Sequence, residues 1–190
     1  MGVLGIALLV LLGVIALYAV VTYNNLVTLK HNVAKAWANI EVLLKQRNDE
    51  LPKLVETCKQ YMRFEQETLQ RVMEARAQSQ MAHAAGNMAA LGQAEGALRA
   101  ELGRLFAVAE AYPDLKTNET FQHLQGRITQ LENSIADRRE LYNESVNINN
   151  VRIEQFPDAI IAGLFNFKPF QLLEFSDGEK SDVDMKKLFA

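Results

Sequence analysis

The sequence has only one cysteine and no block of like charge. A single cysteine cannot form a disulfide within the chain or complete a cysteine-based zinc site, which agrees with a reducing compartment. We interpret Cys58 as a small buried apolar side chain, because no partner cysteine makes it reactive. The formal net charge is −3, with basic and acidic residues intermixed. We therefore expect no nucleic-acid partner.

Catalytic signatures that a helical protein can host are also missing. The chain contains no Glu-x-x-His pair for a di-iron site, no His-Glu-x-x-His, no Gly-x-Ser-x-Gly and no phosphate-binding glycine loop. His31, His83 and His123 fall on different predicted helices or turns without obvious carboxylate pairing. We therefore expect no enzyme activity, no cofactor and no metal site.

The chain does contain one long apolar run. Residues 3–21 hold thirteen Leu, Ile or Val side chains and no charged residue. On an insertion scale, these side chains favour the membrane by roughly 4 to 8 kcal/mol. At about 1.5 Å per residue, a helix of this length just crosses a hydrocarbon layer of about 30 Å. We predict a single transmembrane helix over residues 1–23.

The alternative interpretation of this run is a cleaved signal peptide that ends near residues 17–19. A basic segment before the run is absent, and the run is longer than the usual signal-peptide core of about 7 to 15 residues. Lys30 and Lys35 follow the run, and no lysine or arginine precedes it. Because positive residues favour the cytoplasmic side, we expect the remainder of the chain in the cytoplasm.

Residues 24–156 show hydrophobic periodicity of three and four residues, which predicts a long antiparallel four-helix bundle. We expect the first helix to end at residues 48–52, where polar residues precede Pro52 and the chain reverses. The three helices that follow are predicted over residues 53–84, 88–111 and 119–155.

The fourth predicted helix has the longest apolar series. Its members recur at three- and four-residue steps over more than four heptads. The series consists of Phe121, Leu124, Ile128, Leu131, Ile135, Tyr142, Val146 and Ile153. Arg138 and Asn149 interrupt it in phase, and we interpret them as polar residues that set the register inside the seam.

The third predicted helix carries small residues on nearly one side, namely Gly92, Gly96, Ala100 and Gly103. Each glycine lowers helix stability by about 1 kcal/mol relative to alanine, so we expect a close backbone approach that offsets this loss. The close contact would be with the second helix or with another subunit. A weak helix end without such a contact is the alternative.

Residues 157–175 form an apolar segment that is too short and too broken to span a bilayer. Counting helix directions brings this segment back to the membrane surface. Its candidate membrane or subunit contacts are Phe165, Phe167, Phe170, Leu172, Leu173 and Phe175. Packing against its own bundle is the remaining interpretation. Residues 176–190 are charged and contain glycine, which predicts a flexible tail.

Three long strings resemble the LemA family of membrane-anchored bacterial proteins. They are YNNLVTLKHNVAKAWANIEVLLKQRNDELPKLVETCKQY (residues 23–61), AVAEAYPDLKTNETFQHLQ (residues 107–125) and LENSIADRRELYNESVNINNVRIEQFP (residues 131–157). Together with the apolar run, the resemblance covers most of the chain to Phe175. It implies one membrane helix, a long helical bundle at the bacterial inner membrane and no established catalytic residues.

The expected function is a membrane-anchored scaffold or adaptor that self-assembles as a homo-oligomer on the lipid bilayer. A long bundle fixed at one end offers its lateral faces to identical neighbours. The alternative is a regulatory binding module that presents its bundle or tail to a protein partner of unknown identity.

Overall fold

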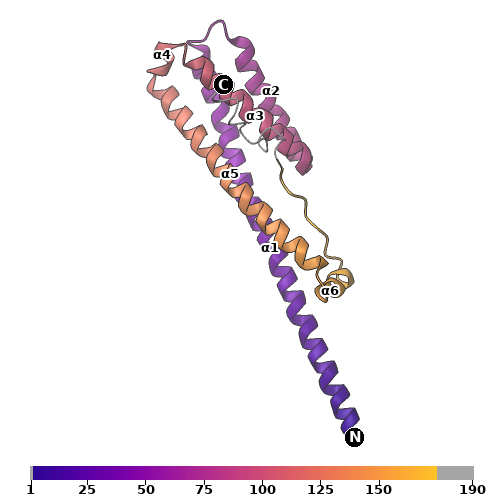
Figure 1. The fold of residues 1–190 in the computed structure, drawn as a ribbon. Coiled ribbons are helices and arrows are strands. Elements are labelled where there is room, and N and C mark those ends of the chain that lie inside the picture. The colour runs from indigo at the N-terminus through magenta and orange to yellow at the C-terminus, as the bar shows by residue number, and fades with distance from the viewer. Residues whose placement is uncertain (1, 175–190) are drawn as a thin grey trace, which may run out of the picture. The chain divides into compact units, whose positions relative to one another are not determined.

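The computed structural model describes residues 2–174, and every regular element within them is a helix. These helices are α1 (Val3–Lys59), α2 (Gln66–Ala84), α3 (Met88–Ala109), α4 (Pro113–Lys116), α5 (Glu119–Glu154) and α6 (Asp158–Leu164), as Figure 1 shows. The predicted all-α class is therefore confirmed for this part of the chain. Phe175 and the predicted tail over residues 176–190 lie outside the described residues.

α1 is a single helix that begins with the apolar run and continues far beyond it (Figure 1). An 18-residue window within it has a mean hydropathy of 2.9, and none of that window is buried. By length and composition this helix is able to cross a membrane.

The predicted chain reversal at residues 48–52 is wrong, because α1 runs on to Lys59 with Pro52 inside it. Proline has no backbone N–H, so the carbonyl of Asn48, four residues earlier, loses its normal helical donor. Arg76 of α2 donates from Nε to that carbonyl at 2.9 Å. A side chain from a second helix therefore satisfies the backbone group that the proline leaves open.

Burial explains why the helix continues past this proline. Leu51, Leu54 and Cys58 lie on one face of α1 and are 0% exposed. In one continuous helix these side chains share a face and enter the core together, and burial of each leucine is worth about 1.5–3 kcal/mol. The second helix is correspondingly shorter than predicted, because the chain reverses over residues 60–65 instead. Burial also raises the pKa of the Cys58 thiol to about 12, so this cysteine stays an unreactive thiol.

Arg76→Met should lower the melting temperature of the protein by about 3–6 °C. The change leaves the Asn48 carbonyl without its charged donor, which costs about 1.5 kcal/mol, and each kcal/mol shifts the melting temperature of a chain of this size by about 2–4 °C. In a Pro52→Ala background the backbone N–H returns, so the same Arg76→Met change should have a smaller effect. Circular dichroism in detergent measures both. Equal shifts in the two backgrounds would contradict the assigned hydrogen bond.

The chain divides into two compact units. Among the described residues, unit 1 contains residues 2–39 and 140–172, and unit 2 contains residues 40–139 and 173–174. α1 and α5 contribute residues to both units.

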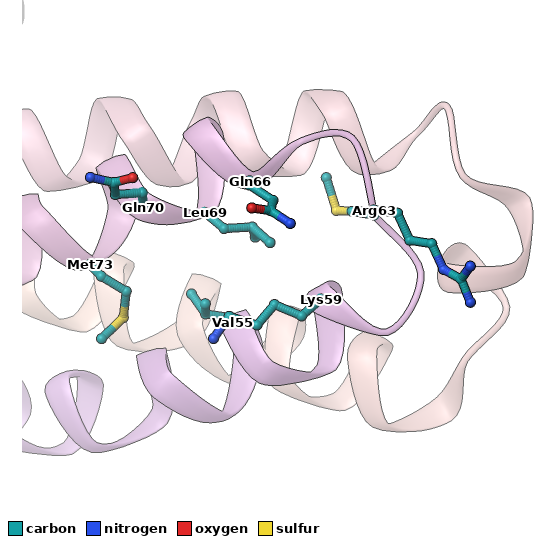
Figure 2. Close-up of a pocket in the computed structure, with 8 residues that line it drawn as sticks. Val55, Lys59, Arg63, Gln66, Leu69, Gln70 and Met73 are labelled. Atoms are coloured by element: carbon teal, nitrogen blue, oxygen red, sulfur yellow. The ribbon is translucent and has the colours of Figure 1, made fainter.

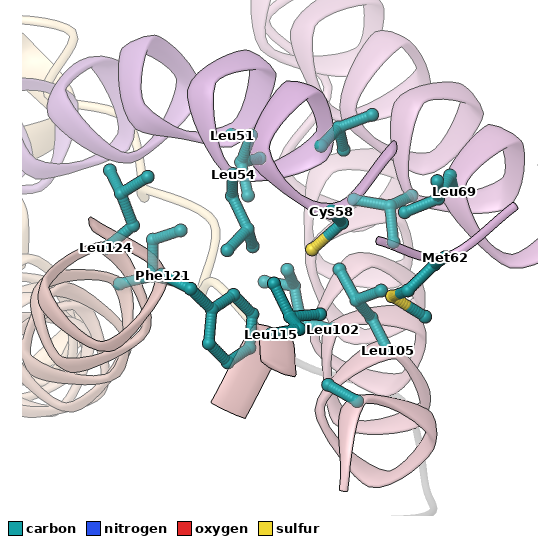
Figure 3. Close-up of a cluster of buried hydrophobic side chains, with 14 of the residues drawn as sticks. Leu51, Leu54, Cys58, Met62, Leu69, Leu102, Leu105, Leu115, Phe121 and Leu124 are labelled. Carbon is teal, nitrogen blue, oxygen red and sulfur yellow. The ribbon is translucent and has the colours of Figure 1, made fainter. Parts of the chain in front are cut away.

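Unit 2 has a continuous apolar core. Side chains from α1, α2, α3, α4 and α5 meet in it, as Figure 3 shows for Leu54, Cys58, Leu102, Leu115 and Phe121. α2 and α3 are joined by a short turn in which Gly86 has a φ of 65°, a left-handed conformation that glycine adopts without strain. Asn87 then caps α3, and Asn118 caps α5 by accepting from the backbone N–H of Phe121 at 2.9 Å.

Unit 2 also contains a buried charge network that sequence reasoning did not predict. Arg47 is 0% exposed and forms a two-point contact with Glu95, with Nη1–Oε2 and Nη2–Oε1 distances of 2.6 and 2.8 Å. Nη1 of Arg47 also lies 2.9 Å from Oε1 of Glu132, and Nε of Arg99 lies 3.2 Å from Oε2 of Glu132. Ser79 donates to Glu95. The two arginines balance the two glutamates in formal charge.

The pKa of Arg47 reflects two opposing effects. Burial lowers the pKa of the guanidinium, but the hydrogen bonds and negative charges of Glu95 and Glu132 outweigh it and leave the pKa raised. Arg47 therefore stays charged inside the core. Removing one of these partners would leave the remaining charge buried and uncompensated, which is strongly destabilising.

The predicted small-residue seam of α3 has one member in close contact with backbone. A Cβ built on Gly92 would clash with the backbone carbonyl oxygen of Glu174, so no other residue fits there without a shift of the chain. Gly103 is exposed, and a Cβ there would meet nothing described within 4 Å. Gly96 is half-buried and Ala100 is exposed. The seam as a packing surface stays a prediction.

Candidate functional site

A buried carboxylate in unit 1 fastens α6 to the end of the apolar run of α1. Asp158, the first residue of α6, is 2% exposed. It accepts hydrogen bonds from the hydroxyls of Tyr18 and Thr22, the latter at 3.3 Å, and it forms an ion pair with Arg152 of α5. Tyr18 and Thr22 are four residues apart and therefore share one face of α1. Three contacts thus fix the start of α6 at the level of the last turns of the apolar run.

The sequence after Asp158 explains how α6 ends and where the chain goes next. The backbone N–H of Phe167 donates to the carbonyl of Ala162 at 2.9 Å, and that of Asn166 donates to the carbonyl of Gly163 at 3.2 Å. Asn166 has a φ of 56°, the left-handed conformation that asparagine tolerates better than most residues. Together these features form a Schellman motif, which stops the helix and reverses the chain.

Side chains of α5 hold the reversed segment in place. The amide of Asn150 donates to the carbonyl of Phe170 at 2.9 Å and accepts from the Phe170 N–H at 3.0 Å. The hydroxyl of Tyr142 donates to the carbonyl of Gln171 at 2.9 Å. Burial raises the pKa of the Tyr142 phenol, so it remains a protonated donor. Because the segment has no regular secondary structure of its own, these bonds determine its path.

The predicted contact residues of this segment separate into different environments. Phe165 and Phe167 pack against Tyr23 of α1, with ring centroids 4.7 and 5.9 Å apart. Phe165 is nevertheless 54% exposed, and Leu172 is 41% exposed. The remaining described members are Phe170, which is half-buried, and Leu173, which is 1% exposed in unit 2. Their roles as lipid or subunit contacts stay a prediction.

A groove of about 490 Å³ lies between α1, α5 and this segment. We call it the α1–α6 groove. Its lining consists of Tyr23, Val27, Lys30 and His31 of α1, Asn149 of α5, and Phe165, Asn166, Phe167, Lys168, Pro169 and Phe170. The described lining contains two lysines and no aspartate or glutamate. The groove therefore combines an aromatic wall with positive charge.

A second pocket, of about 600 Å³, lies in unit 2 between the end of α1 and the start of α2. We call it the α1–α2 pocket. Figure 2 shows Val55 and Lys59 of α1 opposite Leu69 of α2, with Arg63 in the connecting loop. Its lining combines apolar side chains with two glutamines, Gln66 and Gln70, and two cations, Lys59 and Arg63. Among residues 2–174, no group of three or more His, Cys, Asp or Glu residues is arranged to hold a metal ion.

Sequence reasoning missed the residues that assemble the α1–α6 groove. Asp158 directly follows the proline that marks the end of the fourth predicted helix, and an acidic residue in the first turn is a normal helix-start signal. Asn166 follows an apolar stretch, which is a normal helix-end signal. Both local signals indicate the short helix α6. Neither one indicates that Tyr18, 140 residues earlier in the chain, is the partner of Asp158.

Comparison with known proteins gives a consistent result. Magnetosome proteins MamQ 1 and MamQ 2 of Paramagnetospirillum magneticum (strain AMB-1) are each 24% identical to this chain over 203 residues, covering 94% of it and 75% of each relative. Magnetosome protein MamQ of Magnetospirillum gryphiswaldense (strain MSR-1) is 26% identical over 191 residues, covering 86% of this chain and 70% of the relative. The family model for the LemA family matches residues 36–186. This match covers more than half of the chain, and the chain therefore belongs to the LemA family.

Proposed function

We propose that this protein is a membrane-anchored scaffold or adaptor that self-assembles at the bacterial inner membrane. In this proposal the first part of α1 crosses the bilayer, and the rest of α1 forms an antiparallel four-helix bundle with α2, α3 and α5 in the cytoplasm. The observation that carries the proposal is the attachment of α6, through Asp158, to the end of an exposed apolar helix. Membership of the LemA family supports membrane association.

The depth of α6 supports a second contact with the membrane. Tyr18 belongs to the apolar run and Thr22 follows it directly, so Asp158 lies near the boundary of the hydrocarbon layer if α1 spans the membrane. Ile160 and Leu164 of α6 are 61% and 74% exposed. Apolar side chains at this depth leave water and enter the boundary between the lipid headgroups and the acyl chains, which is energetically favourable. α6 thus acts as an interfacial helix beside the span.

An exposed apolar stripe on α5 supports self-assembly. Leu141, Ile148 and Val151 are 45%, 48% and 43% exposed, and their spacing of seven and three residues places them on one helical face. All three belong to unit 1. A second copy of the chain carries the same stripe at the same height above the membrane, and anchoring to one surface raises the effective concentration of the copies for each other. We therefore assign this stripe to the contact between copies.

The mass of the intact protein, extracted from membranes in mild detergent, tests this proposal. We expect a discrete assembly of several copies by light scattering. Leu141→Gln with Ile148→Gln should reduce its mass, whereas Val42→Gln, which changes a 55% exposed apolar residue outside the stripe, should not. A protein that is monomeric at every concentration would reject the scaffold. Alkaline washing of membranes tests anchoring separately, since a chain that washes off is not an integral membrane protein.

The orientation has its own support and test. Lys30 and Lys35 lie within about one span length after the apolar run, which favours a cytoplasmic location for the helices that come after it. A reporter fused after Ala190 should be active in the cytoplasm. Periplasmic activity of the same fusion would reverse the proposed topology.

The α1–α2 pocket favours a second candidate function, a regulatory binding module. Its volume of about 600 Å³ is in the range of ligand and side-chain pockets, and Phe64 in the adjoining loop is 92% exposed. A lining that mixes apolar side chains with Lys59 and Arg63 suits an amphipathic segment of a partner that carries acidic residues. A monomeric protein in detergent would favour this function over the scaffold.

A further inference from the structure

We propose that the α1–α6 groove binds the headgroup of an anionic phospholipid, with its phosphodiester held between Lys30 and Lys168. This inference rests on the proposed crossing of the membrane by α1, and it adds a chemical preference for one class of lipid. The fold does not need the lysines of this groove for its stability. The contacts of Asp158 and the hydrogen bonds of Asn150 already hold α6 and the segment that follows it against α1 and α5.

Position along α1 places the groove at headgroup level. Tyr23, at one end of the groove, is two residues beyond the apolar run, and Lys30, at the other end, is nine residues beyond it. At about 1.5 Å per residue these residues lie about 3 and about 13 Å beyond the run. The polar layer of a bilayer extends about 5–7 Å beyond the hydrocarbon. On α1 the groove therefore begins inside that layer, and the backbone at Lys30 lies about 6–8 Å beyond the outer edge of the layer.

The direction of the side chains brings Lys30 back into the layer. On a helix that leaves the membrane, each Cα–Cβ bond tilts towards the N-terminus, which here is towards the bilayer. A lysine side chain is long and flexible, and it extends its ammonium towards the interface while its methylenes lie along apolar surface. Lys30 and Lys168 are both exposed, so their ammonium groups are accessible to a ligand.

Charge determines which headgroup fits. The described lining has two lysines and His31, and it has no carboxylate to neutralise a choline or ethanolamine group. A zwitterionic headgroup would place its own cation among these lysines, whereas an anionic headgroup such as phosphatidylglycerol brings only negative charge. The preference is therefore for a phosphodiester without a cationic substituent.

The aromatic wall argues for a lipid rather than a soluble phosphate. Tyr23, Phe165 and Phe167 pack in tilted and edge-to-face contacts at the membrane end of the groove. Tyrosine is favoured at this depth because its ring contacts apolar groups while its hydroxyl reaches water, and the two phenylalanine rings beside it offer apolar surface to the glycerol and the upper acyl chain. A free phosphate has no apolar part and would leave this wall unused.

The wall is also rigid, which lowers the entropy lost on binding. The Schellman motif fixes the turn at Asn166, and the two hydrogen bonds between Asn150 and Phe170 fix the far side. Lys168 lies between these two fixed points. Its backbone is thus held in place before any lipid arrives.

Native mass spectrometry of the full-length protein tests the proposal. The protein is equilibrated in detergent micelles that contain equal amounts of phosphatidylglycerol and phosphatidylcholine, and the retained lipids are counted. We expect the intact protein to retain phosphatidylglycerol preferentially. Lys30→Gln and Lys168→Gln should each lower that preference about fivefold, because one basic residue near a membrane surface contributes about that factor. The double variant should lower it about 25-fold, since the two contributions multiply.

Lys35→Gln is the matched control, since it removes the same charge from an exposed position of α1 outside the groove. It should leave the preference unchanged. Equal effects at Lys35 and Lys30 would overturn the proposal in favour of diffuse attraction, as would an intact protein without a preference. Loss of bound phosphatidylglycerol in excess glycerol 3-phosphate would overturn it in favour of a soluble ligand. Circular dichroism of each variant should match the unmodified protein, because all three lysines are exposed.

The same preparations separate this proposal from the proposed function. If the protein resists alkaline washing and forms its assembly but shows no lipid preference, only the groove proposal fails. If the protein washes off the membrane, the proposed anchoring fails first, and the groove proposal fails with it.

Discussion

Glu95→Leu should lower the free energy of unfolding by about 3–5 kcal/mol, one of the two largest effects expected in this protein. The change removes the two-point partner of Arg47 and leaves a guanidinium that is 0% exposed with only Glu132 nearby. Removing one partner of a buried ion pair has this magnitude because the remaining charge stays desolvated. Ser79 also loses the acceptor of its buried hydroxyl. Thermal unfolding in detergent should show a melting temperature lower by about 10 °C.

A double variant distinguishes loss of the pair from loss of packing. Arg47→Met combined with Glu95→Leu removes both charges and fills similar volume, so it should recover most of the stability. Glu132 keeps Arg99 as its partner in that background, with Nε–Oε2 at 3.2 Å. If the double variant is as unstable as Glu95→Leu alone, an unpaired charge is not the cause. As a comparison, Arg71→Met breaks an exposed pair with Glu67 and should leave the melting temperature almost unchanged, because solvent screens an exposed pair.

Leu131→Asp should lower the free energy of unfolding by at least about 3 kcal/mol. Leu131 is 2% exposed on α5, so the substitution both removes apolar contacts and places a carboxyl group in the core. A typical domain is stable by only about 5–15 kcal/mol, which makes a loss of this size visible in any unfolding experiment. Ile135→Asp, one turn later and 1% exposed, should behave in the same way.

His123→Ala is the control for these two variants. His123 lies on the same helix but is exposed, so its removal should leave the melting temperature within about 2 °C. If Leu131→Asp melts like the unmodified protein, the inward face of α5 is wrongly assigned. The three variants together test the register of the helix without reference to function.

The periodic apolar stripes and their inward faces could be predicted from the sequence. Leu26, Val33 and Ile40 of α1 and Ile128 and Leu131 of α5 are all 2% exposed or less. Amphipathic periodicity is a local property, because residues three and four apart share a helical face wherever the helix is placed. The predicted start of α5 at residue 119 is likewise confirmed, since Asn118 caps the helix through a residue only one turn away.

In-phase polar residues show where local pattern stops being sufficient. Arg47, Arg138 and Asn149 all interrupt an apolar series in phase. Asn149 is 1% exposed, Arg47 is 0% exposed and paired, and Arg138 is exposed, so the prediction that Arg138 lies inside the seam is wrong. For a charged residue such as Arg47, burial requires a partner of opposite charge, and here that partner, Glu95, lies on another helix. Glu95 is 48 residues from Arg47 in the sequence, so a local pattern around Arg47 does not reveal the pair.

The sequence by itself determined the all-helical class, the apolar run, the family and most inward faces, because these depend on residue type and on spacing within one turn of helix. Tertiary structure decided whether Pro52 ends α1, which charges are buried and where residues 158–172 attach. Each of these outcomes depends on a partner distant in the chain: Arg76 for the carbonyl of Asn48, Glu95 for Arg47, and Tyr18 for Asp158. A buried polar group is stable only when it is paired, and the partner is brought to it by packing that no local pattern encodes.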